Sequence, residues 1–270
     1  MKAGIYYNKK YFSDNKSYVE RLKKLLVASG AESKAVEGCA DLDGIDVLFV
    51  LGGDGTILTI AAACALKKVR IIGINYGHLG FLAEFEPEKL DEAVALVCSG
   101  DYQVQQRSML EITCGKKTLL ALNDLAIQRS TSGINFCNTV NLHAEIDGAT
   151  VDNFSSDGII ISTPTGSTAY SLAAGGSVLA PDINAFIMTP VCPHSLHSRP
   201  VVFSGNSVVK LNSLDRSRPL ALIADGRIAG EICAGETVTV KRADITADFI
   251  TRDAKNFFNK LLVKLNKWSK

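Results

Sequence analysis

The sequence predicts an α/β domain followed by a β-rich domain, with a single helix at the end of the chain. Three observations lead to this fold class. Apolar strand-like runs alternate with helix-like runs up to about residue 103, and from there to about residue 249 the runs are mostly short and strand-like, separated by turn residues. In residues 256–268 the apolar side chains follow the spacing of an amphipathic helix, which must pack on another part of the protein.

The first domain is predicted from strands and helices in alternation. A buried apolar strand at residues 46–51 runs directly into a glycine-rich turn. Such alternation indicates a parallel sheet covered by helices on both faces, a Rossmann-like arrangement. In chain order, the predicted elements are a strand at residues 2–7, a helix at 18–29, a strand at 46–51, a helix at 57–66, a strand at 70–75 and a helix at 87–98.

The second domain is predicted to be all-β and β-sandwich-like. Asp147-Gly148 is a hairpin signal, because both residues tolerate the positive φ angles of a tight turn. We expect an α/β domain at residues 1–103, a β-rich domain at 104–249, and a helix within 250–270 that returns to the first domain. The strand-like runs are residues 119–128, 139–146, 158–162, 201–203, 208–211, 220–224 and 237–241.

The composition favours a cytoplasmic protein whose partner is a small molecule. The 270 residues carry a formal net charge of +1, without the basic excess that is typical of nucleic-acid binders. No apolar run approaches the roughly 20 residues that span a bilayer, and no secretion signal is visible. The seven cysteines are scattered and never form a Cys-x-x-Cys pair, so neither a disulfide framework nor a zinc site is expected.

The sequence Gly-Gly-Asp-Gly-Thr at residues 52–56 joins a buried strand to a helix. Ligands of open α/β sheets bind at such strand ends, and glycines let phosphate groups approach main-chain N–H groups. An acid beside phosphates is unfavourable unless a metal ion or a hydroxyl proton is present. Asp54 is therefore a candidate to orient or deprotonate an attacking hydroxyl, or to hold Mg²⁺ bound to a nucleotide, although a plain helix cap explains the motif equally well.

Two further loops place polar side chains beside predicted strands. The glycine-rich loop at residues 73–82 contains Asn75, which offers both a donor and an acceptor, although a structural loop explains it better when it is taken alone. Asn123-Asp124 interrupts an apolar run, where a ligand amide or ribose could pair with it, although a bulge or strand end is slightly preferred. Neither the dinucleotide fingerprint Gly-x-Gly-x-x-Gly nor a Walker A motif occurs.

Residues 157–176 contain the most candidate ligand groups. A buried strand after Asp157 runs into five hydroxyl residues, a proline and a glycine, and then into a small-residue helix. Hydroxyls and N–H groups at a helix start form a neutral site for polar or anionic ligands. The flanking apolar strand and helix favour a ligand loop over a solvated hinge.

Together these segments resemble the NAD kinase family, and they occur in the family's order over about residues 47–230. The resemblance implies transfer of the γ-phosphoryl group of ATP to the adenosine ribose 2′-hydroxyl of NAD, by a homodimer or homotetramer. It also implies that Mg²⁺ or another divalent metal arrives with the nucleotide, without a permanent all-protein metal site. The motifs are Gly-Gly-Asp-Gly-Thr, Gly-x-Asn-x-Gly-x-Leu-Gly-Phe-Leu, the Asn-acid pair, Asp-Gly-Ile-Ile-Ile-Ser-Thr-Pro-Thr-Gly-Ser-Thr-Ala-Tyr and Thr-Pro-Val-Cys-Pro-His-Ser-Leu.

By motif match, Asp54 would be the catalytic acid–base residue, which aligns the hydroxyl and accepts its proton late. Asn123 and Asp124 would hold the ribose or adenosine of the dinucleotide, and Asp157 would contact the nicotinamide side. All the nucleotide-binding positions implied by the resemblance are Gly55, Asn75, Phe81, Asn123, Asp124, Asp157, Thr165, Thr168, Ala169 and Tyr170.

Two positions depart from the family's usual pattern. Asp124 stands where Glu is more usual, which shortens the side chain by one methylene and keeps the charge. Ser155 stands where many relatives have an arginine, and the missing cation could weaken a phosphate contact or relax discrimination between NAD and NADH. Two other functions stay open: a catalytically silent NAD(P)-binding regulator, and a kinase of another acceptor in the same superfamily. The retained Asp54 argues against the first, and the ribose-side motifs argue against the second.

Overall fold

A computed structural model describes residues 1–8, 16–76, 80–130, 139–214, 219–253 and 257–268. The chain forms two compact units: unit 1 comprises Met1–Arg107 and Thr246–Lys270, and unit 2 comprises Ser108–Ile245. The strands β5 (Gln103–Cys114) and β16 (Thr237–Thr251) each belong partly to one unit and partly to the other. The predicted boundaries after residues 103 and 249 each fall inside one of these strands.

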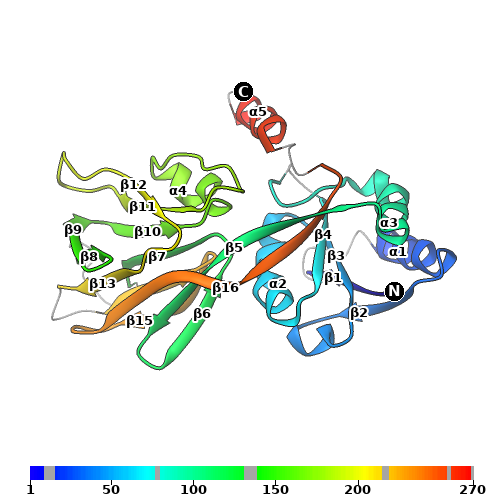
Figure 1. Cartoon of the computed structure of the whole chain (residues 1–270), viewed down its shortest axis with the longest axis horizontal. Coiled ribbons are helices and arrows are strands. Elements are labelled where there is room, and N and C mark those ends of the chain that lie inside the picture. The colour runs from blue at the N-terminus through cyan, green and yellow to red at the C-terminus, as the bar shows by residue number, and fades with distance from the viewer. Residues whose placement is uncertain (9–15, 77–79, 131–138, 215–218, 254–256, 269–270) are drawn as a thin grey trace. The chain divides into compact units, whose positions relative to one another are not determined.

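The sheet of unit 1 consists of the parallel strands β1 (Lys2–Tyr7), β2 (Glu32–Val36), β3 (Val47–Leu51) and β4 (Arg70–Ile74). Their order is β2-β1-β3-β4, and the end of β16 joins beside β4, where Phe249 pairs with Ile71 in parallel register (Figure 1). β3 is buried along its whole length. Complete burial and an unbroken apolar sequence are typical of a parallel strand that has helices on both faces.

Helices cover both faces of this sheet (Figure 1). On one face, Phe49 of β3 packs in a buried cluster with Leu22 and Val94, which come from two different helices. The predicted alternation of strands and helices is confirmed, although the sequence patterns did not indicate β2. The helices on the first face are α1 (Lys16–Ala28) and α3 (Leu90–Ser99), and α2 (Asp54–Lys67) covers the other, with short 3₁₀ helices at Cys39–Leu42 and Pro87–Lys89.

Unit 2 is a sandwich of two largely antiparallel sheets, as the sequence predicts. Ile127 and Ile159 of one sheet share a buried cluster with Leu142 and Val238 of the other, so the core lies between the sheets. The first sheet contains, in spatial order, β12 (Val201–Ser204), β11 (Ala185–Val191), β10 (Gly158–Ser162), β7 (Asp124–Arg129), β14 (Leu220–Ala224) and β15 (Arg227–Ile232). The second contains the start of β16, then β13 (Val209–Ser213), β8 (Val140–Ile146) and β9 (Ala149–Ser156), with β6 (Lys117–Ala121) paired to β5.

Several local details of unit 2 differ from the sequence prediction. The apolar run at residues 119–128 is two strands, β6 and β7, with Leu122 and Asn123 between them. The small-residue helix after the hydroxyl-rich loop is one turn long, α4 (Tyr170–Ala173). The hairpin at Asp147-Gly148 is confirmed: both residues have positive φ angles, 52° and 81°, between β8 and β9.

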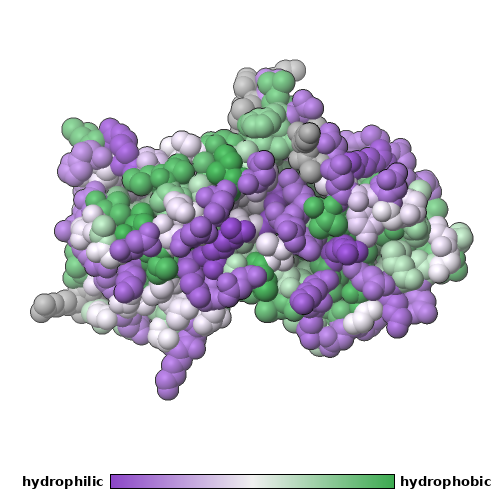
Figure 2. Space-filling model, in the orientation of Figure 1, coloured by the Kyte–Doolittle hydropathy of each residue, from purple (hydrophilic) through white to green (hydrophobic). Residues whose placement is uncertain are grey.

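The C-terminal helix, α5 (Phe257–Trp268), packs on unit 1. The ring centroids of Phe257 and Phe81 lie 6.2 Å apart, and Lys260 Nζ forms a 2.6 Å ion pair with Glu84 Oε2. On the opposite side of α5, Phe258 is 67% exposed. Figure 2 shows apolar surface on this helix. Within the described ranges, no helix is both long enough and apolar enough to cross a membrane.

Candidate active site

Asp54 begins helix α2, directly after the glycine turn that ends β3. Its carboxylate accepts an N–H bond on each oxygen, from Phe81 at 2.7 Å and from Leu82 at 3.1 Å. These two bonds fix the orientation of the carboxylate. The side chain is 29% exposed, so it stays accessible to a ligand. A carboxylate oxygen that accepts one hydrogen bond can accept another, which leaves acceptor capacity for a hydroxyl group.

The loop that holds Asp54 requires glycine at position 80. A Cβ atom on Gly80 would stand 2.0 Å from Asp54 Oδ1, far inside any contact distance. On the other side, Gly52 has a φ of +155°, and its Cβ would stand 2.3 Å from Thr56 Oγ1. Both sequence motifs of unit 1 therefore use glycine to bring main chain close to the start of α2.

The other predicted residues of unit 1 lie around this loop and helix. Asn75 is buried, and its main-chain N–H donates to Phe85 O at 2.8 Å. Gly55 is exposed in the first turn of α2, where its carbonyl accepts the Thr59 hydroxyl at 3.0 Å. Phe81 is buried, and its ring packs with α5. The motif residues thus belong to one local structure, in which Phe81 and Leu82 contact Asp54 through their main-chain N–H groups.

Helix α5 brings to Asp54 a cation that the sequence motifs do not indicate. Lys264 Nζ lies 3.9 Å from Asp54 Oδ2 and 3.8 Å from the centroid of the Phe81 ring. The Lys264 side chain is 12% exposed. Burial lowers the pKa of the Lys264 ammonium, and the Asp54 carboxylate opposes that shift.

In unit 2, Asn123-Asp124 lies at the break between β6 and β7, and Asp225 holds this break in place. The Asp225 carboxylate accepts main-chain N–H bonds from Leu122 at 2.9 Å, Asn123 at 2.7 Å and Asp124 at 3.2 Å. Thr163 donates its N–H to Asn123 O at 2.9 Å. The side-chain oxygen of Asn123 is buried and has no hydrogen-bond partner among the described residues. A buried acceptor of this kind favours a ligand that brings a donor.

Asp124 is a buried acid with an unusual proton affinity. Burial raises its pKa to about 7, and the charge of Asp225 adds to the shift. Burial also raises the pKa of Asp225, but its three N–H bonds work in the opposite direction and favour the charged form. Near neutral pH, Asp124 can therefore both donate and accept a hydrogen bond. Ribose hydroxyl groups pair well with such a group.

Asp157 and Tyr170 both contact the end of β7. Asp157 Oδ1 forms a 2.9 Å salt bridge with Arg129 Nη2, and the Gln128 side-chain amide donates to the Tyr170 hydroxyl. Burial raises the pKa of Tyr170, and the nearby carboxylates of Asp124 and Asp157 add to the rise. The carboxylates of Asp124 and Asp157 therefore both lie close enough to Tyr170 to affect its pKa.

Three of the five hydroxyl residues in the hydroxyl-rich loop bond within the protein. Ser162, Thr163 and Ser167 are fully buried. The Thr163 hydroxyl donates to Leu122 O at 2.6 Å, and the Ser167 hydroxyl donates to Pro164 O at 2.7 Å. The hydroxyls of Ser162 and Thr163 therefore hold the loop against the Asn123 break, through Asn123 O and Leu122 O, whereas the Ser167 hydroxyl bonds within the loop.

The predicted binding residues of this loop also lie in tight local structure. Gly166 passes so close to Asn123 that a Cβ atom would stand 2.1 Å from its carbonyl oxygen. The Thr168 hydroxyl donates to Thr165 O at 3.1 Å, and the Ala169 N–H donates to Gly166 O at 2.8 Å.

Comparison with known proteins identifies the family. The ATP-NAD kinase N-terminal domain matches residues 4–102, and the ATP-NAD kinase C-terminal domain matches residues 122–252. The chain belongs to the ATP-NAD kinase family. It is therefore a phosphotransferase by family, as the resemblance of its motifs predicts. The NAD kinase of Chlorobium limicola is 35% identical over 254 residues, which are 91% of this chain and 86% of that protein.

Solved structures share the fold. The NAD kinase from Archaeoglobus fulgidus, solved in complex with ATP, superposes with a TM-score of 0.81 at 25% identity and covers 98% of this chain and 99% of its own. Yeast NADH kinase, solved with NADH, gives a TM-score of 0.85 at 24% identity over 98% of this chain and 87% of its own. These likenesses confirm the predicted fold class.

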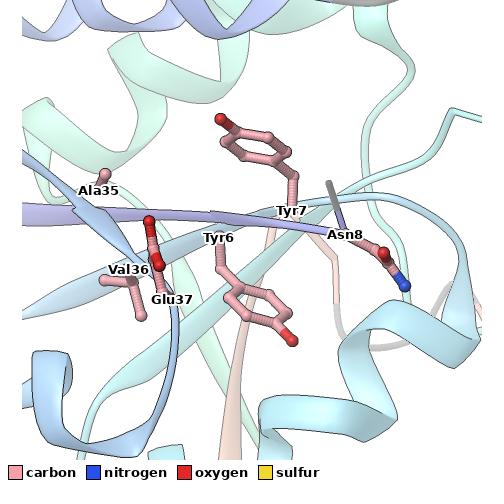
Figure 3. A pocket seen from close by; sticks show the side chains of 6 residues that line it. All are labelled: Tyr6, Tyr7, Asn8, Ala35, Val36 and Glu37. Carbon is pink, nitrogen blue, oxygen red and sulfur yellow. The ribbon is translucent and has the colours of Figure 1, made fainter. Parts of the chain in front are cut away.

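A separate cavity of about 270 Å³ opens at the carboxyl ends of β1 and β2. Tyr6 and Tyr7 extend to opposite sides of β1, and Asn8 and Glu37 complete the polar lining (Figure 3). Strand ends of this kind often bind ligands in α/β sheets. The cavity is smaller than the roughly 300–1,000 Å³ of typical ligand pockets, and it contains none of the predicted site residues.

Proposed function

We propose that this protein transfers the γ-phosphoryl group of ATP to the 2′-hydroxyl of the adenosine ribose of NAD, with Asp54 as the catalytic acid–base residue. Family membership supports the reaction. The observation that supports the role of Asp54 is its geometry: a partly exposed carboxylate fixed by two main-chain N–H groups at a strand end. The Archaeoglobus fulgidus relative was solved with ATP, which supports ATP as the donor.

In this proposal, Asp54 aligns the attacking hydroxyl and accepts its proton late. Phosphoryl transfer through a loose transition state needs little early deprotonation, so positioning contributes most of what the carboxylate provides. The N–H bonds from Phe81 and Leu82 satisfy one acceptor site on each oxygen and prevent the carboxylate from rotating. The hydroxyl can therefore be held at one angle throughout the reaction.

Unit 2 would bind the dinucleotide. Asn123 and Asp124 would hold the ribose or adenosine, because the buried Asn123 oxygen accepts a hydrogen bond and Asp124 can donate or accept near neutral pH. Asp157 would contact the nicotinamide side, and Thr165, Thr168, Ala169 and Tyr170 would line the same site. Arg129 would then orient Asp157 through their salt bridge.

Magnesium would enter with ATP and neutralise phosphate charge during the transfer. Within the described part of the chain, no group of three or more His, Cys, Asp or Glu side chains is arranged to hold a metal ion. The acceptor sites that remain on the Asp54 carboxylate fit a metal ion that already has phosphate ligands, since such an ion needs one or two carboxylates from the protein. Gly55, Asn75 and Phe81 would form the surrounding nucleotide contacts.

We further propose a homodimer or homotetramer in the cytoplasm. The resemblance to the NAD kinase family supports an oligomer, and the exposed apolar face of α5 at Phe258 and Leu262 offers surface to bury. The six described cysteines are free thiols, which suits a reducing compartment. Light scattering behind a sizing column would measure the subunit number directly.

A coupled assay tests the proposed reaction. Purified protein is mixed with NAD, ATP and Mg²⁺, and NADP is measured through an NADP-specific dehydrogenase, with each component omitted in turn. We expect NADP only when all three are present. Binding of NAD without NADP formation would refute the proposal, and substitution of NADH or polyphosphate would define the substrate range.

A further inference from the structure

Helix α5 presents one side chain, Lys264, at the carboxylate to which the proposed function assigns catalysis. The side of α5 that packs on unit 1 carries Phe257, Lys260 and Lys264, at positions three and four residues apart that share a helix face. Phe257 packs near Phe81 and Lys260 pairs with Glu84, so this face of the helix has contacts to unit 1 besides those of Lys264. Lys264 lies on the same face, beside Asp54.

Orienting Asp54 does not require Lys264. Both oxygens of Asp54 already accept main-chain N–H bonds at 2.7 and 3.1 Å, whereas the ammonium lies 3.9 Å away, beyond hydrogen-bond distance. What Lys264 adds is a positive charge in a site where its side chain is 12% exposed. Its position over the Phe81 ring, 3.8 Å from the centroid, is a favourable cation–π contact that keeps the ammonium at this place.

A cation at this place suits phosphoryl transfer. The transferring group carries negative charge past the Asp54 carboxylate, and the two repel unless positive charge lies close to both. A hydroxyl oxygen that Asp54 aligns would lie roughly 2.6–3.2 Å from its carboxylate, with the phosphorus one bond further. The Lys264 ammonium lies 3.9 Å from the same carboxylate. Because the lysine side chain is long and flexible, the ammonium can reach the oxygens of that phosphoryl group.

We propose that Lys264 is a second catalytic residue, whose ammonium binds the phosphoryl group during its transfer from ATP to the ribose hydroxyl. The bond from the γ-phosphorus to the bridging oxygen of ADP breaks, the bond to the ribose oxygen forms, and Asp54 receives the hydroxyl proton. Lys264 keeps its proton and its charge throughout. This inference rests on the proposed function for its reaction, but the binding of phosphate by Lys264 can be tested separately.

The test compares three full-length variants with the wild-type protein. Lys264→Met removes the charge and keeps the stem, and Lys264→Arg keeps a positive charge. Lys260→Met is the matched control, since it removes a lysine of the same helix that pairs with Glu84 and not with Asp54. Two quantities are measured for each: kcat and KM in the coupled assay, and the calorimetric Kd of inorganic tripolyphosphate.

We expect Lys264→Met to lower kcat about 100-fold while the KM for NAD changes less than about threefold, because a charge that acts on the transition state affects mainly kcat. The Kd of tripolyphosphate should rise about tenfold, and Lys264→Arg should recover at least about a tenth of the wild-type kcat. Lys260→Met should keep kcat and the tripolyphosphate Kd within about threefold of wild type.

Three results would overturn the inference: a tripolyphosphate Kd that Lys264→Met does not change, no measurable tripolyphosphate binding by the wild type, or equal losses in Lys260→Met and Lys264→Met. The last result would assign both lysines to helix docking only. A wild-type protein that binds tripolyphosphate through Lys264 but makes no NADP would refute the proposed function and leave the phosphate-binding role of Lys264 standing.

Discussion

Replacement of Asp225 by asparagine tests how the candidate dinucleotide site is held together. Asp225 has a positive φ of 48°, which asparagine also tolerates, so Asp225→Asn preserves the turn and the side-chain volume. The amide nitrogen, however, would face an N–H donor. Oδ1 accepts from Asn123 and Asp124 while Oδ2 accepts from Leu122, and an amide oxygen can replace only one of these two acceptors.

The cost follows from the lost hydrogen bonds. A hydrogen bond to a charged group contributes roughly 1.5–3 kcal/mol, so the loss of at least one such bond should lower the free energy of unfolding by about 2 kcal/mol. For a protein of this size that corresponds to a fall of about 4–8 °C in the thermal midpoint. The break at Asn123 would also lose its fixed geometry, and we expect the Kd for NAD to rise about tenfold, or about 1.4 kcal/mol.

The matched control is Asp147→Asn, in the other Asp-Gly turn of unit 2 that has the same backbone conformation. Asp147 is exposed, and its side chain accepts the Val208 N–H at 2.8 Å and a hydrogen bond from the Ser207 side chain. Because this carboxylate lies in solvent, the variant should lose less than about 1 kcal/mol. Thermal unfolding and NAD calorimetry on both variants check the prediction. Equal midpoint shifts in the two variants, or an unchanged Kd for NAD in Asp225→Asn, would refute the role assigned to Asp225.

Two further predictions concern the pH dependence of stability and the fit around Asp54. Burial raises the pKa of Asp124 from 3.8 to about 7, so between these pH values the folded state holds a proton that the unfolded chain has lost. The free energy of unfolding should therefore fall as the pH rises from about 4 to about 7. Above this window Asp124 should cause no further loss. Urea unfolding at several pH values should show this slope in the wild type and a flatter one in Asp124→Asn; equal slopes would contradict the assignment. Gly80→Ala would place a Cβ atom 2.0 Å from Asp54 Oδ1, so we expect kcat to fall about 100-fold through displacement of the carboxylate. Gly38→Ala, where a Cβ meets nothing within 4 Å, is the control, and an active Gly80→Ala enzyme would show that the carboxylate position is not critical.

Elements set by local pattern were predictable from the sequence. The run Val47–Leu51 is apolar at every position and becomes the fully buried strand β3, and residues 158–162 form β10 with the predicted bounds. The Asp147-Gly148 turn follows from the conformations that these two residues tolerate. In each case, neighbouring residues in the sequence decide the structure.

Features set by distant residues were not predictable. The break between β6 and β7 depends on Asp225, which lies 101 residues after Asp124. In the sequence, the hydroxyls of Thr163 and Ser167 look like ligand groups. The structure shows that both are buried and donate to main-chain carbonyl oxygens. Lys264 resembles any solvated lysine of an amphipathic helix until α5 docks near Asp54. Only the first of these three features left a signal in the sequence, because Asp225-Gly226 is a pair of residues typical of a tight turn.

The measurement that tests the central claim most directly compares wild type with Asp54→Asn. NADP formation is followed in the coupled assay, and the Kd for NAD is measured by calorimetry on the same preparations. We expect the variant to bind NAD within about threefold of the wild-type Kd and to lose at least about 1,000-fold in kcat, because it keeps the fold but lacks the carboxylate that aligns the hydroxyl and accepts its proton. Near-normal NADP formation by Asp54→Asn would contradict the role of Asp54 in the reaction.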